Sequence, residues 1–239
     1  MRWQSRGKWR LSSRSDDASK LVWPQRRPGG IHDRVRRFVD DQAIPRERPT
    51  LAHDVEQVDV VARELRGLAK EAGVYTPQLP GALGGLGLNW RDRAVVLEEL
   101  GRSFLGPIAA NRAPPDRPNM INLLGEIRSC FAMTEPPPGA GSDPSMLQTH
   151  AVRTAAGWKS NGRKWFISGA VGAAFAIVLA RTELGATCFI VDAKTPGYRV
   201  LRNIHSIDGF QIGGHGEIEL VDCEVPDDAV LATVGKGFE

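Results

Sequence analysis

A segment from Cys130 to Asp143 combines residue types that could hold a small ligand. It reads Cys-Phe-Ala-Met-Thr-Glu-Pro-Pro-Pro-Gly-Ala-Gly-Ser-Asp. The apolar start predicts a short strand, and three consecutive prolines then exclude both helix and sheet pairing. The small residues that follow would let a ligand lie against bare backbone. A hydroxyl, a carboxylate and free amides suit a flat ligand with polar rim atoms and a phosphate. A strand that simply ends in a proline–glycine loop is the alternative.

A second stretch, from Asn161 to Gly169, could complete such a site, because it places an aromatic ring at Phe166 close to a hydroxyl at Ser168. Residues 150–159 and 163–168 have strand-like composition and flank Asn161-Gly162. An Asn-Gly pair between two such runs is a strong signal for a two-residue hairpin turn. The sequence therefore predicts that Phe166 and Ser168 lie on the second strand of a hairpin.

The elements before these stretches are predicted to be helical. Three amphipathic segments follow one another: about Asp33–Gln42, a helix capped by Asp54 and closed by Gly73, and Trp90–Arg102 capped by Asn89. In the third, the spacing places Ala94, Leu97 and Leu100 inward and Glu98 and Glu99 outward.

From residue 127 onward the periodicity is that of strands. Further strands are expected at Phe175–Ala180, Thr187–Val191, Tyr198–Ile204 and Glu217–Val225. Many short strands separated by turns indicate a β-barrel or sandwich. The predicted class is α+β: a basic disordered leader at 1–30, a helical N-terminal domain at 31–126 and a β-barrel middle domain at 127–239.

Composition limits the functional classes. The 239 residues are 41% apolar and 25% charged, as in ordinary globular proteins. No apolar run approaches the ~20 residues of a membrane span. Cys130, Cys188 and Cys223 form no Cys-x-x-Cys pair, which argues against a metal site and a disulfide framework and favours a reducing, cytoplasmic compartment.

Charge is uneven along the chain. Residues 1–30 carry +6, so the remaining residues carry −3 of the total of +3. The body therefore has no reason to bind nucleic acid. The leader is interpreted as a disordered tail or as sequence upstream of the true start. A nucleic-acid arm or a mitochondrial transit peptide, which would imply the matrix, are the alternatives.

Several motifs together resemble the acyl-CoA dehydrogenase family. The most specific are Met133-Thr134-Glu135-Pro136 and the run Asn161-Gly-Arg-Lys-Trp-Phe-Ile-Ser168. The resemblance covers roughly Glu71 to Glu239. Further matching stretches are Gly84–Leu88, Glu98–Arg102, Gly125–Glu135, Gly141–Asp143 and Glu219–Pro226.

The resemblance implies an FAD enzyme that removes two hydrogens from the α and β carbons of an acyl-CoA. Residues at matching positions would contact the flavin rim, face and N5 edge, and Ser142 would touch the acyl-CoA. Thr134 would bond the pyrimidine edge, Phe166 would pack on the flavin face, and Ser168 would point at N5. The cofactor-binding set is Phe131, Met133, Thr134, Phe166, Ile167 and Ser168. Glu135 and Asp143 are interpreted as structural.

Members of this family also have a C-terminal helical bundle, which supplies the catalytic glutamate and most of the subunit interface. The expectation from the sequence is a truncated architecture with no catalytic base and impaired activity, passing electrons to an electron-transfer flavoprotein or similar acceptor. A homo-oligomer would be expected if the bundle were present. A non-catalytic flavin- or acyl-CoA-binding remnant, and a flavin monooxygenase or acyl-CoA oxidase of the same fold, remain alternatives; a nucleic-acid binder is the weakest.

Overall fold

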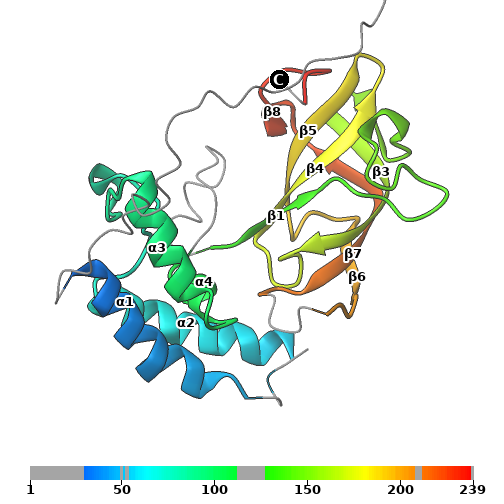
Figure 1. Ribbon diagram of the computed structural model, residues 1–239. Helices are drawn as coiled ribbons and strands as arrows, with labels where there is room; N and C mark the ends of the chain where they lie inside the picture. Colours follow the sequence, from blue (N-terminus) through cyan, green and yellow to red (C-terminus); the bar gives the residue numbers. More distant parts are fainter. Residues whose placement is uncertain (1–29, 49–50, 52–53, 112–126, 208–211, 238–239) are drawn as a thin grey trace, which may run out of the picture.

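The computed structural model describes residues 30–48, 51, 54–111, 127–207 and 212–237. Helices occupy the first part of the described chain and strands occupy the part after residue 127 (Figure 1). This arrangement confirms the predicted α+β class. The prediction of a disordered leader falls almost wholly on residues 1–29, which lie outside the described residues, and the boundary at residue 126 falls at the end of a second such segment.

The helical half contains two long helices and several short ones. In chain order they are α1 (Ile31–Phe38), a π-helical turn (Val39–Ala43), a 3-10 turn (Ile44–Arg46), α2 (Val55–Glu71), a 3-10 turn (Gly81–Leu83), α3 (Trp90–Leu100) and α4 (Gly106–Ala109). The first helix begins at Ile31, two residues before the predicted start at Asp33. After Phe38 the chain continues in a wider π-helical turn and then a tighter 3-10 turn, so α1 is shorter than predicted, and Val35, Phe38 and Val39 are buried.

The caps of α2 and α3 lie where the sequence predicts them. The Asp54 side chain accepts a hydrogen bond from the Gln57 amide at 3.0 Å, and the Asn89 side chain accepts one from the Asp92 amide at 3.0 Å. These bonds satisfy amides that a helix start leaves without partners.

The predicted inner face of α3 is partly wrong. Ala94 is exposed, whereas Val96 and Glu99 are buried together with Leu100. Glu99 lies inside because its carboxylate contacts His32 Nε2 at 3.1 Å and Arg102 Nη1 at 3.0 Å. The Arg102 guanidinium and the hydrogen-bonding imidazole offset the cost of burying a charge, and the hydrophobic spacing cannot indicate them.

The β half is one eight-stranded sheet. Its strands are β1 (Ser129–Ala132), β2 (His150–Thr154), β3 (Gly157–Ser168), β4 (Phe175–Thr182), β5 (Gly185–Asp192), β6 (Tyr198–Asn203), β7 (His215–Val225) and β8 (Val230–Leu231). The hydrogen-bonded order is β6-β7-β3-β2-β4-β5-β8, and β1 pairs in parallel with β4.

The predicted hairpin turn at Asn161-Gly162 is wrong. The chain turns earlier, between Thr154 and Gly157, and Asn161-Gly162 lies inside β3 at an irregularity in its pairing with β7. Gly162 has φ +151°, and a Cβ there would lie 2.5 Å from Thr149 Oγ1. The glycine therefore permits a close contact with Thr149, a role that the Asn-Gly pattern does not separate from a turn.

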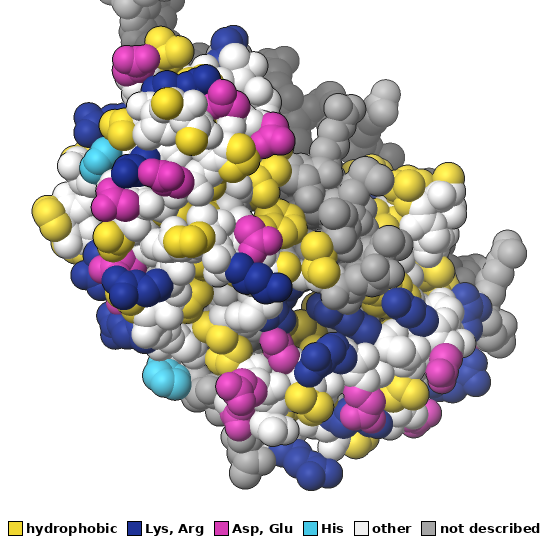
Figure 2. Space-filling model, turned by 180° about the vertical axis from the view of Figure 1, so that it is seen from behind, with side chains coloured by type: hydrophobic (Ala, Val, Ile, Leu, Met, Phe, Trp, Pro, Cys, Tyr) yellow, Lys and Arg dark blue, Asp and Glu magenta, His cyan; other side chains and the backbone are white. Residues whose placement is uncertain are grey.

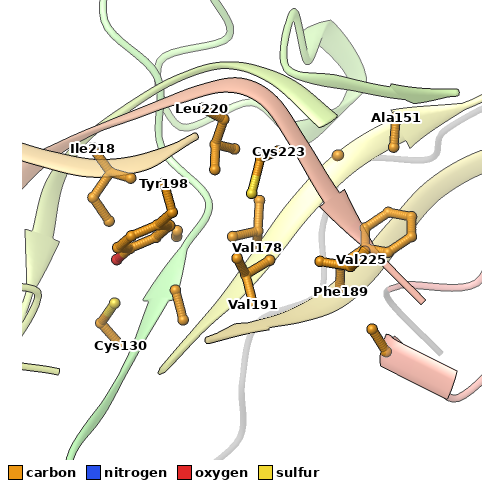
Figure 3. Packing of buried hydrophobic residues seen from close by; sticks show 14 of the residues in the cluster. Cys130, Ala151, Val178, Phe189, Val191, Tyr198, Ile218, Leu220, Cys223 and Val225 are labelled. Atoms are coloured by element: carbon orange, nitrogen blue, oxygen red, sulfur yellow. The ribbon is translucent and has the colours of Figure 1, made fainter. Parts of the chain in front are cut away.

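The sheet curls around a core to which strands distant in the order contribute, as expected of a barrel. The ring centroids of Trp158 on β3 and Phe189 on β5 lie 5.5 Å apart, although these two strands are not neighbours in the sheet. Figure 3 shows Tyr198, Cys130, Cys223 and their apolar neighbours directed toward one another in this core. Burial raises the pKa of Cys130 and of Cys223 to about 11, so both thiols stay protonated near neutral pH.

Contacts between the halves hold them together. Arg128, just before β1, pairs with Asp59 of α2 at 2.8 Å and also donates to the Val171 carbonyl between β3 and β4. Ile212, from the connection between β6 and β7, packs in the helical core. The β half is therefore oriented by an ion pair and by an apolar anchor in the helices.

Charged side chains of both signs are mixed on the surface. Dark blue and magenta side chains intermingle over the face in Figure 2. Exposed ion pairs such as Arg199–Glu219 at 2.5 Å and Arg153–Asp227 at 2.7 Å join neighbouring strands and turns. In the described ranges, no helix combines the length and apolar character that crossing a membrane requires. No cluster of three potential metal ligands was found there either.

Candidate functional site

Strand β1 and the residues that follow it present apolar side chains on the side away from the core. Cys130 and Ala132 are buried inside, so the alternation of the strand turns Phe131 outward, and Phe131 is 49% exposed. Met133 is half-buried and packs against a small apolar cluster on the outer side of the sheet. The predicted flavin contacts Phe131 and Met133 are thus available at the surface.

A bulge in β3 exposes a second aromatic ring. Lys164 pairs with Ile218 and Ile167 pairs with Gly216, so Trp165 and Phe166 together oppose one residue of β7. Phe166 has φ +51°, a left-handed conformation that costs a non-glycine residue about 1–3 kcal/mol. The bulge leaves the Phe166 side chain 48% exposed. Bulges often redirect a side chain next to functional sites, and this one redirects a large apolar ring into solvent.

Thr134 connects the two exposed segments. Its carbonyl accepts a hydrogen bond from the Trp165 amide at 3.0 Å, and its hydroxyl donates to the Trp165 carbonyl at 2.5 Å. The end of β1 is thereby held against the bulge. In this arrangement the Thr134 hydroxyl uses its proton internally and keeps lone pairs with which to accept a bond from a ligand.

The same two segments are joined underneath by a buried ion pair. The Lys164 ammonium, fully buried, donates to the Met133 carbonyl and to Glu135 Oε1, both at 2.9 Å. Glu135, 1% exposed, also accepts backbone hydrogen bonds from Ala140, Gln148 and Thr149 at 2.8–3.0 Å. One carboxylate therefore fixes β1, β3 and both ends of the proline loop.

The pair shifts both ionisation equilibria. Burial lowers the pKa of Lys164 to about 8, although Glu135 opposes this change. Burial alone would raise the pKa of Glu135, but its hydrogen bonds and Lys164 outweigh this effect and lower the pKa to about 2. Both groups are charged at neutral pH. Because Glu135 is buried and fully bonded, it is a structural group here and is not placed to accept a proton from a ligand.

The end of β3 places the remaining predicted residues on opposite sides of the sheet. Ser168 is exposed, like Phe166 two positions earlier, whereas Ile167 between them is 2% exposed and packs in the core. The Ile167 side chain therefore cannot contact a ligand on the outer side; only its backbone could. The Ser168 hydroxyl lies 3.0 Å from His215 Nδ1.

Ser142 lies in the loop that Glu135 anchors. It is exposed and follows Gly141, whose carbonyl accepts a hydrogen bond from the Glu135 amide at 3.0 Å. Next to it, Asp143 accepts hydrogen bonds from the Ser145 hydroxyl at 2.7 Å and from its amide, and these bonds lower the Asp143 pKa. Asp143 thus shapes the loop, and Ser142 remains accessible for a ligand.

We call the outward surface formed by Phe131, Met133, Thr134, Phe166 and Ser168 the aromatic face. It combines two half-exposed rings with hydroxyls on adjoining segments. These residues fit a planar apolar ring system with polar edge atoms: the rings cover a face, and the hydroxyls bond the rim. The arrangement is suited to binding and orienting such a ring system.

The sequence does not predict two residues that belong to this region. Lys164 occurs in a matching motif, but nothing in its spacing indicates that it is fully buried. His215 lies 47 positions after Ser168 and becomes its neighbour only because β3 and β7 pair antiparallel. No local signal in the sequence could have identified this contact.

Comparison with protein-family models gives two matches. The model described as acyl-CoA dehydrogenase, N-terminal domain, matches residues 30–112, and the model described as acyl-CoA dehydrogenase, middle domain, matches residues 130–223. The first match covers the helices, and the second runs from β1 into β7 and includes every residue of the aromatic face.

Two curated proteins illustrate the similarity. Acyl-CoA dehydrogenase family member 11 of Mus musculus is 29% identical over 94% of this chain and 33% of its own length. The (R)-benzylsuccinyl-CoA dehydrogenase of Thauera aromatica is 31% identical over 85% of this chain and 57% of its own length. The chain thus spans about a third of the length of the first of these relatives.

Solved structures show the same fold. A structure described as a putative acyl-CoA dehydrogenase from Mycobacterium abscessus has a TM-score of 0.73 and 28% identity, over 87% of this chain and 60% of that one. An acyl-CoA dehydrogenase from Bacillus anthracis, described as complexed with FAD, has a TM-score of 0.66 and 23% identity, over 87% of this chain and 37% of that one. The arrangement of helices and sheet therefore recurs in solved proteins.

Proposed function

Because the chain belongs to the acyl-CoA dehydrogenase family, which is a family of oxidoreductases, we propose that its aromatic face binds FAD for α,β-dehydrogenation of an acyl-CoA thioester. The observation that carries this proposal is the strained bulge, which holds Phe166 half-exposed beside Thr134. A strained residue that exposes a large apolar ring lowers the stability of the free chain, and such features cluster at ligand-binding sites.

In this proposal each residue of the aromatic face has its own task. Phe131, Met133 and Phe166 cover apolar ring surface and exclude water. Thr134 accepts a hydrogen bond at the pyrimidine edge, and Ser168 meets the edge where hydride is received. When bound, FAD supplies the acceptor for that hydride. The accessible Ser142 hydroxyl contacts the acyl-CoA, and reducing equivalents pass to an electron-transfer flavoprotein or a similar acceptor.

Abstraction of the α proton requires a base, and Glu135 does not provide it. A base must lie within about 2.6–3.2 Å of the proton it takes, or one water away. Glu135 is buried, and both its oxygens are occupied by Lys164 and backbone amides. We assign no catalytic base among the described residues and propose that the chain alone dehydrogenates poorly.

Measuring FAD affinity in single variants of the full chain tests the binding proposal. Thr134→Ala and Phe166→Ala should each weaken FAD binding about tenfold or more, because one bond to a polar group or one stacked ring is lost. Leu201→Ala removes an exposed apolar side chain of β6 and is the matched control for Phe166→Ala. Asp143→Ala is the control for a polar change in the loop. Equal FAD affinity in all four variants would contradict the assignment.

Anaerobic titration of the FAD-loaded chain with acyl-CoAs of several lengths tests the reaction. We expect bleaching of the flavin band to be far slower than a typical turnover of about 10 per second. Bleaching near that rate would show that a base lies within residues 1–239. In air, release of peroxide would distinguish an oxidase from a dehydrogenase.

A further inference from the structure

His215 and Ser168 face each other across two paired strands. They are register partners on β7 and β3, and His215 Nδ1 lies 3.0 Å from Ser168 Oγ. Ser168 is exposed on the aromatic face, so the imidazole adjoins the hydroxyl that is assigned to the hydride-receiving edge. Nothing in the motifs that place Ser168 includes this histidine.

The backbone around the pair holds it in place. The Gly169 amide donates to the Gly214 carbonyl at 2.8 Å, and the His215 amide donates to Asn203 Oδ1 at 2.8 Å. Gly214 has φ +53°, and a Cβ on it would lie 2.1 Å from Asn203 Oδ1. The strand ends therefore meet without room for a side chain. The imidazole cannot leave the hydroxyl by a backbone shift unless these contacts break.

A serine hydroxyl has one proton to donate and two lone pairs, so its partner decides what it offers on the other side. If Nδ1 carries a lone pair, it accepts a hydrogen bond from the Ser168 hydroxyl. Ser168 can then only accept a hydrogen bond from a ligand. If Nδ1 carries a proton, it donates to Ser168 Oγ, and the hydroxyl proton is free to point at a ligand. The two arrangements differ in whether Nδ1 carries a proton and therefore in the direction of the hydrogen bond between Nδ1 and Oγ.

We propose that His215 is a positioning residue that sets whether Ser168 meets the bound ring nitrogen as a hydrogen-bond acceptor or as a donor. This inference rests on the proposed function. A hydroxyl that faces a hydride-receiving nitrogen must be able both to accept a hydrogen bond from that atom and to donate one to it. A fixed imidazole beside Ser168 lets one side chain meet both requirements.

The charged side chain nearest to His215 along β7 is paired with arginines of the two neighbouring strands. Glu217, two residues along β7, is held by Arg163 Nη2 and by Arg202 Nε, both at 2.6 Å. On β6, the uncharged Asn203 pairs with Gly216 and accepts the hydrogen bond from the His215 amide through its side chain. The Ser168 hydroxyl is a direct partner of Nδ1, and its removal should be visible at that nitrogen.

The first test measures FAD affinity and the flavin midpoint potential in the full chain at a fixed pH. His215→Phe removes the bond and should weaken FAD binding about fivefold to tenfold, as expected for one lost hydrogen bond. It should have no further effect when added to Ser168→Ala. His215→Asn keeps a polar atom near the position of Nδ1 and should restore affinity and potential close to the original values. His150→Phe, at an exposed histidine of β2, is the matched control.

The outcomes separate this inference from the proposed function. If His215→Phe leaves affinity and potential unchanged while Ser168→Ala alters them, His215 has no positioning role. If His215→Asn behaves like His215→Phe, the polar atom is not what matters and the inference fails. If the unmodified chain binds no FAD, the proposed function fails instead.

A second measurement does not need the cofactor. In the ¹⁵N-labelled chain without FAD, the Nδ1 resonance of His215 should shift when Ser168 is replaced by alanine, and the resonances of His150 should not. An unchanged Nδ1 resonance would show that the hydroxyl and the imidazole are not bonded, and it would overturn the inference whatever FAD does.

Discussion

Glu99 in the helical half and Glu135 in the β half are both buried, and the two are neutralised in different ways. Glu99 of α3 is surrounded by side chains on flexible stems: His32, Arg36 and Arg102. Glu135 is bound by the fully buried Lys164 and by three backbone amides. Glu99 is therefore neutralised at the border with solvent, and Glu135 inside a closed network.

This difference shows which carboxylate determines local geometry. The arginines around Glu99 are partly exposed and can re-form contacts with water if the carboxylate changes. The partners of Glu135 are held by the backbone and by burial, so no substitute can reach them. The network around Glu135 also lies directly beneath the aromatic face, and its rigidity fixes the distance between Thr134 and the bulge.

The largest effect is expected when the closed network loses its cation. Lys164→Met leaves the Glu135 charge buried without its cation and should lower the free energy of unfolding by about 3–5 kcal/mol. Urea denaturation followed by circular dichroism measures this change. Lys159→Met is the matched control, because Lys159 lies on the same strand but forms an exposed pair with Glu224 at 3.1 Å. Equal losses in the two variants would remove the distinction between the networks.

Acid should weaken the Glu135 network. Its folded-state pKa of about 2 lies below the ordinary value of 4.5, so its contribution is complete above pH 4.5 and is lost as the pH falls toward 2. Between pH 6 and pH 3 the stability advantage of the unmodified chain over Glu135→Gln should shrink by about 2 kcal/mol. Urea titrations of both proteins at the two pH values measure this. An advantage that stays constant or grows in acid contradicts the assignment.

A smaller loss is expected at the solvent border of the helical half. Glu99→Gln keeps the shape of the side chain but removes the charge that His32, Arg36 and Arg102 share. It should cost about 1.5 kcal/mol, near the lower limit for hydrogen bonds to charged groups. The same urea titration measures it, with Glu98→Gln, at an exposed neighbour, as the control. A loss above that of Lys164→Met would reverse the comparison.

The smallest effect is expected for an ion pair that is open to water. Arg199→Ala breaks the pair with Glu219 and should change the free energy of unfolding by less than about 1 kcal/mol. Its effect should also decrease at high salt. A loss that is larger, or insensitive to salt, would mean that the outer surface of β6 and β7 contributes more than its exposure suggests.

The sequence predicts the architecture well, because the fold depends on periodicity and caps. The spacing of Val58, Ala62 and Leu65 defines the buried side of α2, and the apolar run from Phe175 defines the central strand β4. Phe131 and Phe166 could be assigned to the aromatic face by resemblance alone, and the structure places both at the surface. Whether they contact FAD remains a prediction.

What the sequence could not predict depends on partners distant in the chain. The sequence pattern predicts that Glu99 faces solvent, because its cationic partners are not on the same helix. Arg36 lies on α1, and Arg102 follows the end of α3. Asn161-Gly162 reads as a turn because the Thr149 contact that requires glycine is not local. Ile167 reads as a member of the site because its neighbours are, although the alternation of β3 turns its side chain into the core. For Glu99 and for Asn161-Gly162, tertiary contacts outweigh the local pattern.

The anchor at Ile212 has a consequence for how the chain is made. Ribosomes release the N-terminal half first, yet the core of that half includes a side chain that is added more than a hundred residues after Ala110. At typical synthesis rates of about 5–20 residues per second, that delay is roughly 5–20 s. During this interval the nascent helices must wait with part of their apolar surface uncovered, so the order of translation makes the helical half dependent on the β half for its final closure.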